Sequence, residues 1–97
     1  MSRFSDLIQR QLGFFTEDNA DLIAACDVAE RAYDRAGRED AEERYAAYLE
    51  LVEEAVDALT EIRDTYASTL EEDVAEDYER AFDHEVERRL PRFTLGL

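Results

Sequence analysis

The chain has no lysine and no tryptophan, a single proline (Pro91) and a single cysteine (Cys26). One cysteine cannot form an internal disulfide, which is typical of proteins in a reducing cytosol. No apolar run approaches the roughly 18–20 residues that a membrane span requires. Residues 1–15 lack the long apolar core and cleavage site of a secretory signal. We therefore expect a cytoplasmic protein that does not interact with a membrane.

Positive charge is also scarce. The 97 residues include 26 Asp and Glu against 11 Arg, which gives a formal net charge of −15. Binding to nucleic acid requires clustered cations that neutralise phosphates, so we expect no nucleic-acid partner, while a cationic protein partner remains open. Many carboxylates without any Lys resemble the composition of cytosolic proteins from salt-accumulating halophiles. A GC-rich genome would explain the preference for Arg but not the excess of acid.

Helix breakers are rare: the chain has one proline, Pro91, and three glycines, Gly13, Gly37 and Gly96. A chain rich in Ala, Glu, Arg and Leu with so few breakers favours helix throughout, and no stretch alternates as a strand would. We predict an all-α single domain over residues 1–97. Its architecture is expected to be an antiparallel helical bundle of three main helices plus a short N-terminal helix, with residues 91–97 as an apolar tail.

Caps and breakers predict the helix boundaries. The first helix is expected to end or bend at Gly13, followed by Phe14 and Phe15 at a turn. A second helix should begin near Thr16 or Asp18 and end near Gly37. The third and longest helix is expected over residues 40–68. Thr69 and Glu72 are spaced as a capping box that opens a fourth helix, and Pro91 should stop it.

The third helix carries the clearest pattern. Tyr45, Val52, Leu59 and Tyr66 recur every seven residues, and further apolar positions widen this stripe as a bundle helix requires. At 1.5 Å per residue the helix would be roughly 43 Å long, whereas a compact domain of this size is only about 32 Å across. The mismatch predicts that a second copy covers part of the stripe in a homodimer. Alternatively, the helix breaks within 40–68 and folds back.

The candidate interface combines this stripe with the apolar tail. The tyrosines fit either core packing or an interface, and the tail fits either folding back over the bundle or docking into another subunit. The residues that we assign to the candidate interface are Tyr45, Tyr48, Val52, Leu59, Tyr66, Phe93 and Leu95.

Catalytic and metal chemistry find little support in the sequence. A di-metal bundle site usually requires Glu-x-x-His pairs, but residue 81, three before His84, is Ala. The acids of the third helix lie opposite its apolar stripe and are interpreted as a solvated face. His84 is interpreted as a surface residue and Cys26 as a small buried hydrophobe. We expect no catalytic residues, no metal, no cofactor and no small-molecule ligand.

The function that the sequence favours is that of a small, non-catalytic, acidic helical protein of a halophile-like cytosol. It would act through self-association or by binding another protein. Two alternatives stay open: a cryptic small-molecule or metal site within the bundle, and an acidic mimic of nucleic acid that occupies a basic protein.

Overall fold

The computed structural model describes residues 3–94, and every regular element in this range is helical. Four α-helices follow one another as α1 (Ser5–Asp18), α2 (Ala20–Arg35), α3 (Ala41–Ala67) and α4 (Glu72–Arg89), and a 3₁₀ helix, η1, spans Pro91–Phe93. The predicted all-α class is therefore confirmed for the described part of the chain. No helix within residues 3–94 is long and apolar enough to cross a membrane.

The break between the first two helices lies at Asn19, and the predicted end at Gly13 is wrong. Gly13 is an interior residue of α1, so the first helix is not a short one. Glycine costs a helix only about 1 kcal/mol relative to Ala, and Leu12 and Phe15 on either side of it are buried. Burial of two large side chains, at about 1.5–3 kcal/mol each, outweighs that cost. At Asn19 the side-chain amide donates a hydrogen bond to the Phe15 carbonyl at 3.0 Å.

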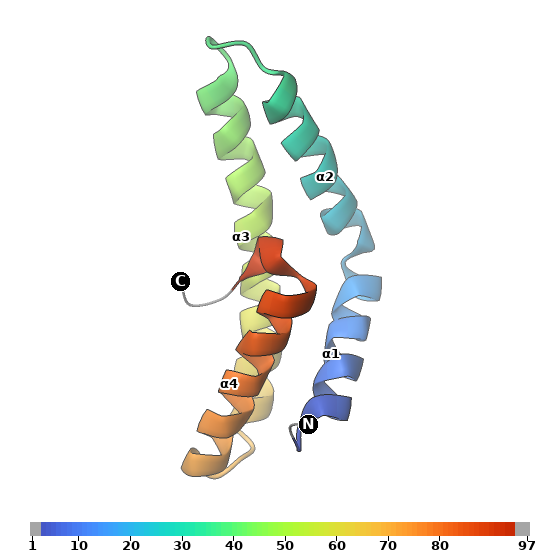
Figure 1. Cartoon of the computed structure of the whole chain (residues 1–97), viewed down its shortest axis with the longest axis vertical. Helices are drawn as coiled ribbons and strands as arrows, with labels where there is room; N and C mark the ends of the chain where they lie inside the picture. Colours follow the sequence, from blue (N-terminus) through green and yellow to red (C-terminus); the bar gives the residue numbers. More distant parts are fainter. Residues whose placement is uncertain (1–2, 95–97) are drawn as a thin grey trace.

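The third helix is continuous from Ala41 to Ala67, close to the predicted range of 40–68. It gives the molecule an elongated shape, with principal extents of 50 × 23 × 21 Å. The expectation of a compact domain about 32 Å across, from which the predicted length mismatch was derived, is therefore wrong. α2 and α3 lie side by side as a helical hairpin that extends well beyond the end of α4 (Figure 1).

The fourth helix starts without the predicted capping box. The Thr69 hydroxyl donates to the Tyr66 carbonyl at 2.7 Å, so it closes the end of α3, and α4 has no side-chain cap at its start. The predicted stop is confirmed: α4 ends at Arg89, and Pro91 begins the 3₁₀ turn η1.

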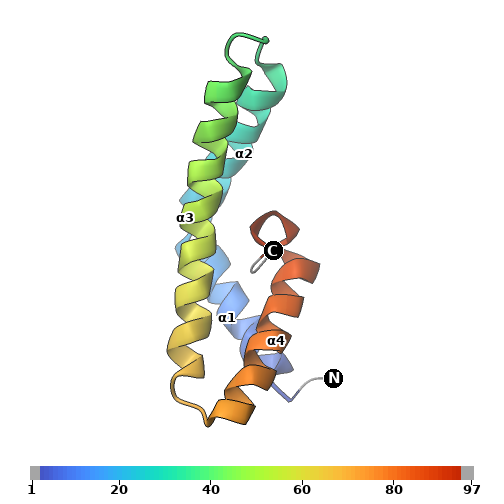
Figure 2. The ribbon, with the colours of Figure 1, turned by 90° about the vertical axis from the view of Figure 1, so that its left-hand side faces the viewer.

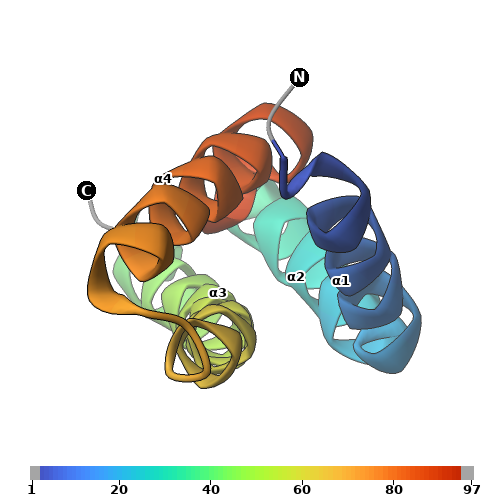
Figure 3. The same ribbon diagram turned by 90° about the horizontal axis from the view of Figure 1, so that it is seen from below.

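The core lies where α1, α3 and α4 surround one another, as seen along the long axis in Figure 3. Each of these helices contributes three fully or almost fully buried side chains, and Cys26 and Phe93 complete the set. These residues are Ile8, Leu12 and Phe15 of α1, Ala55, Leu59 and Ala67 of α3, and Tyr78, Phe82 and Val86 of α4. We call α1, α4 and residues 55–67 of α3 the base. The contacts among its helices support the expected bundle in part.

Candidate functional site

The described part of the tail, residues 91–94, folds back across the hairpin, and the covered part of the molecule ends there. Arg92 donates from Nη1 to Asp27 Oδ1 at 2.7 Å and from Nη2 to Glu30 Oε1 at 2.8 Å. Its guanidinium also lies 5.8 Å from the centre of the Tyr48 ring. The hydrogen bond to Asp27 raises the pKa of Arg92 above its usual range. Phe93 packs edge-on against Phe15, with ring centres 6.1 Å apart.

Beyond this tail, no described element packs over the α2–α3 hairpin. Figure 2 shows that α4 and η1 reach only about half the height of α3. We call residues 28–49, the end of the hairpin that projects past η1, the arm. It contains none of the eleven buried hydrophobic residues of the described chain. The arm is a pair of helices without a third layer.

Large apolar side chains remain exposed on the arm. Tyr45 is 45% exposed, Tyr33 38% and Leu49 36%. The rings of Tyr33 and Tyr45 pack with their centres 5.1 Å apart, and Tyr45 also approaches Tyr48 at 6.4 Å. Tyr45 and Leu49 are four residues apart and therefore neighbours on one face of α3. We call Tyr33, Tyr45, Tyr48 and Leu49 the tyrosine patch.

The candidate interface predicted from the sequence divides between the arm and the base. Tyr45 is exposed, and Tyr48, Val52 and Tyr66 are half-buried. Leu59 and Phe93 are 0% and 2% exposed, because α1, α4 and the folded tail cover them. Leu95 lies outside the described residues. A partner that docks on this chain as it stands therefore has access to the arm end of the stripe, not to Leu59.

Two patch residues, Tyr33 and Leu49, were not among the predicted interface residues. Tyr33 follows Ala29 by four residues and Cys26 by seven, so it shares a helical face with these small apolar residues, and Leu49 belongs to the apolar stripe of α3. Nothing in either local pattern marks them as exposed. The difference in helix length is the feature that indicates their exposure. α4 has 18 residues and α3 has 27, so α4 cannot cover the whole of α3.

Charge is distributed unevenly between the arm and the helices below it. Residues 28–49 contain six acidic residues and four Arg, a net charge of −2, whereas residues 50–79 contain twelve acidic residues and one Arg, a net charge of −11. The predicted acidic face of α3 is exposed throughout, at Glu50, Glu53, Glu54, Asp57, Glu61 and Asp64. The tyrosine patch thus belongs to a segment with charges of both signs and a small net charge.

The residues considered for catalysis are separated from one another. His84 is exposed on α4, while Cys26 is fully buried on α2. Burial raises the pKa of the Cys26 thiol, which opposes formation of the thiolate that nucleophilic chemistry requires. Within residues 3–94, no group of three or more His, Cys, Asp or Glu side chains is placed to hold a metal ion.

No protein-family model matches the chain, and the comparisons with curated proteins and with solved structures gave no match either. Function is therefore inferred from the geometry of the arm and the base.

Proposed function

We propose that the protein is a non-catalytic, cytoplasmic interaction protein that self-associates as a homodimer through its arm. The observation that carries this proposal is the tyrosine patch, where Tyr33, Tyr45 and Leu49 are each more than a third exposed. Tyrosine supplies a large rigid contact area with a polar end and is enriched at the centres of interfaces. A two-fold pairing would bury the same patch on both copies, the commonest arrangement among soluble oligomers.

The charge distribution supports the arm rather than the base as the contact between copies. Two chains of net charge −15 repel one another, and the repulsion is smallest where the arms, each of net charge −2, come together. The four Arg of the arm are also available to pair with acids of the second copy. On this account the chain is an antiparallel bundle whose unfinished end is completed by its partner.

We further propose that this association takes place in a cytosol of high salt. Molar salt shortens the Debye length to about 3 Å, which removes most of the repulsion between the two acidic chains and leaves the apolar contact of the arms. Neither a nucleic acid nor a membrane surface is proposed as a partner, because both carry the same sign of charge as this protein.

Sedimentation equilibrium in molar KCl tests the proposal. At micromolar concentration we expect a mass of twice 11.2 kDa, and Leu49→Asp should return it to the monomer without loss of helix content. The matched control is Thr65→Asp, which adds the same charge to an exposed position of the same helix outside the arm and should leave the dimer intact. A monomeric mass for the wild-type chain would reject the homodimer.

A further inference from the structure

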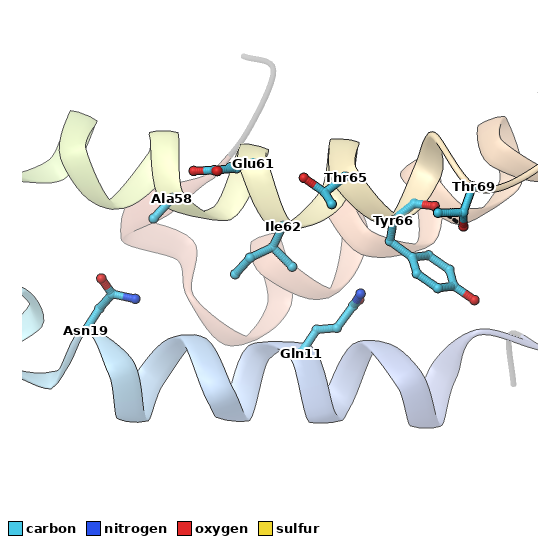
Figure 4. A pocket seen from close by; sticks show the side chains of 8 residues that line it. All are labelled: Gln11, Asn19, Ala58, Glu61, Ile62, Thr65, Tyr66 and Thr69. Atoms are coloured by element: carbon cyan, nitrogen blue, oxygen red, sulfur yellow. Dashed lines mark hydrogen bonds between the residues drawn. The ribbon is translucent and has the colours of Figure 1, made fainter.

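A hollow of about 560 Å³ lies between α1 and α3 (Figure 4). Ala58, Ile62 and Tyr66 form its α3 wall, and these residues follow one another four apart along one face of the helix. In Figure 4 the side chains of Ala58 and Ile62 point from α3 into the space, and Gln11 points into it from α1. The floor and walls are therefore mainly apolar along about two turns of α3.

A second, separate hollow lies further along α3, towards the arm. It has a volume of about 420 Å³ and lies between α2 and α3, with Ala47 and Leu51 in its α3 wall. Ala47, Leu51, Ala58 and Ile62 are separated by four, seven and four residues, so they form one stripe along α3. We call the two hollows together the furrow. Its length along α3 suits a helical segment of a partner rather than a small molecule.

Beside the first hollow, the α3 edge of the furrow carries negative charge that no cation of residues 50–79 is free to balance, whereas Arg44 lines the second hollow. Glu61 lines the first hollow. Asp57 and Glu54 lie one and two helical turns before Glu61 on α3. Within residues 3–94, none of the three carboxylates makes an ion pair or a hydrogen bond. Arg63 is the only cation in residues 50–79, and it is already paired with Asp64 at 2.9 Å and Asp83 at 2.8 Å.

We infer that the furrow binds a cationic amphipathic helix of another protein. The apolar side of such a helix would lie against Ala58 and Ile62, in the helix-in-groove mode of recognition. Its Lys or Arg side chains would reach Glu54, Asp57 and Glu61, and complementary charge of this kind also speeds association. A second copy of this chain is a poor occupant of the furrow, because its own helices would bring further carboxylates to Glu54, Asp57 and Glu61, where the only cation of residues 50–79 is already paired.

Three synthetic peptides test the inference. The probe is an amphipathic helix of about 18 residues, long enough to be helical when bound, made of Leu and Lys. One control has the same composition in scrambled order, and the other has Glu in place of Lys. Calorimetric titration at 0.15 M KCl should show the probe binding at least tenfold more tightly than either control. Equal binding of the scrambled peptide would mean attraction by charge alone and would overturn the proposal, as would equal binding of the Glu peptide.

The location of binding is tested on the wild-type protein. In ¹⁵N-labelled protein titrated with the Leu–Lys peptide, amide shifts should concentrate at Gln11, Ala58, Ile62 and Tyr66. Shifts confined to the tyrosine patch would contradict the furrow as the site.

Matched variants then separate the apolar and charged contributions. Ile62→Gln should weaken probe binding about tenfold, whereas Leu49→Gln, an equivalent change on the tyrosine patch, should not alter it. The double variant with Asp57→Asn and Glu61→Gln, both at exposed positions, should weaken binding at 0.15 M KCl and have little effect in molar KCl. Unchanged affinity in both sets of furrow variants would reject the site.

Discussion

The base and the arm share the same helix, α3, but they bury it differently. In the base, α3 contributes Leu59 to a core that also holds Phe82 and Tyr78, all of them fully buried. In the arm, α3 faces α2 and, at Tyr48, only the side chain of Arg92, and Tyr45 remains 45% exposed. Two helices alone cannot enclose a large side chain, because a helix buries only a stripe and needs neighbours on both sides of it. The base is therefore complete as a monomer, and the arm is the part that a partner would complete.

The same comparison applies to charge. Residues 50–79, which form the lower part of α3 and the start of α4, carry a net charge of −11, and the arm carries −2. Electrostatic repulsion between identical chains is therefore strong at residues 50–79 and weak at the arm. The difference is the reason why we propose the arm for self-association and the acidic edge of the furrow for a cationic partner.

The largest difference is expected when one large side chain is removed from each region. Phe82→Ala should lower the free energy of unfolding by about 3–5 kcal/mol, because it leaves a cavity in the core of the base. Leu49→Ala should cost less than about 1 kcal/mol in the monomer. Urea denaturation of both variants at low protein concentration measures the two values. Similar losses would show that the arm is packed as firmly as the base.

Ionisation of Tyr78 should destabilise the base at high pH. Burial raises the pKa of Tyr78 to about 12, and its hydroxyl donates to Gln11 Oε1 at 2.8 Å. Because the pKa is higher in the folded chain, this contribution is present below pH 10 and is lost as the pH rises from 10 through 12. The loss should be about 2 kcal/mol.

Stability measured against pH, together with ultraviolet titration of the tyrosinates, tests this prediction. Tyr78→Phe should remove the ionisation near pH 12 and flatten the stability profile above pH 10. A variant that retains the late ionisation would show that it belongs to another tyrosine.

Salt should stabilise the acidic helices. Like charges four residues apart, such as Glu50 and Glu54 or Asp57 and Glu61, each cost a few tenths of a kcal/mol, and several such pairs together cost on the order of 1–2 kcal/mol. Screening by KCl should recover this energy and raise the melting temperature. Asp57→Asn should reduce the salt dependence by relieving repulsion at low salt. A melting temperature that does not change from low to molar KCl would contradict both the electrostatic account and the high-salt setting.

The smallest effect is expected at the junction between the base and the arm. A double-mutant cycle of Arg92→Ala and Asp27→Ala should give a coupling energy of about 0.5–1 kcal/mol, because the pair is partly exposed and screened by solvent. Asp27 is 49% exposed and Arg92 24%. The matched cycle of Arg80→Ala and Asp77→Ala, an exposed pair within α4, should give less. Coupling at Arg92 no larger than at Arg80 would mean that the tail does not hold the hairpin.

Local signals in the sequence were sufficient for the helical class, for the extent of α3 and for the stop at Pro91. They misplaced the first break, because the propensity of Gly13 was outweighed by the burial of Leu12 and Phe15, which depends on α4 and η1. The predicted capping box is absent for a related reason. The Thr69 hydroxyl donates to a carbonyl at the end of α3 instead of capping α4, and the spacing between Thr69 and Glu72 does not indicate which of the two helices Thr69 will bond.

The candidate interface was predictable only in part. Periodicity identifies the apolar stripe of α3 but not which turns of it the other helices cover. That depends on where α4 ends and where the tail returns, so Leu59 and Tyr45 look equivalent in the sequence and differ in the structure. The contact between Tyr33 and Tyr45 depends on the angle of the hairpin, which no local pattern encodes.

Hydrogen exchange measured at several protein concentrations compares the two regions in one experiment. In molar KCl, amides of the arm (residues 28–49) should exchange more slowly as the concentration rises from the nanomolar to the high micromolar range, because the homodimer covers them. Amides of the base should exchange at the same rate throughout. Exchange in the arm that is independent of concentration would contradict the central claim that the arm is where two copies meet.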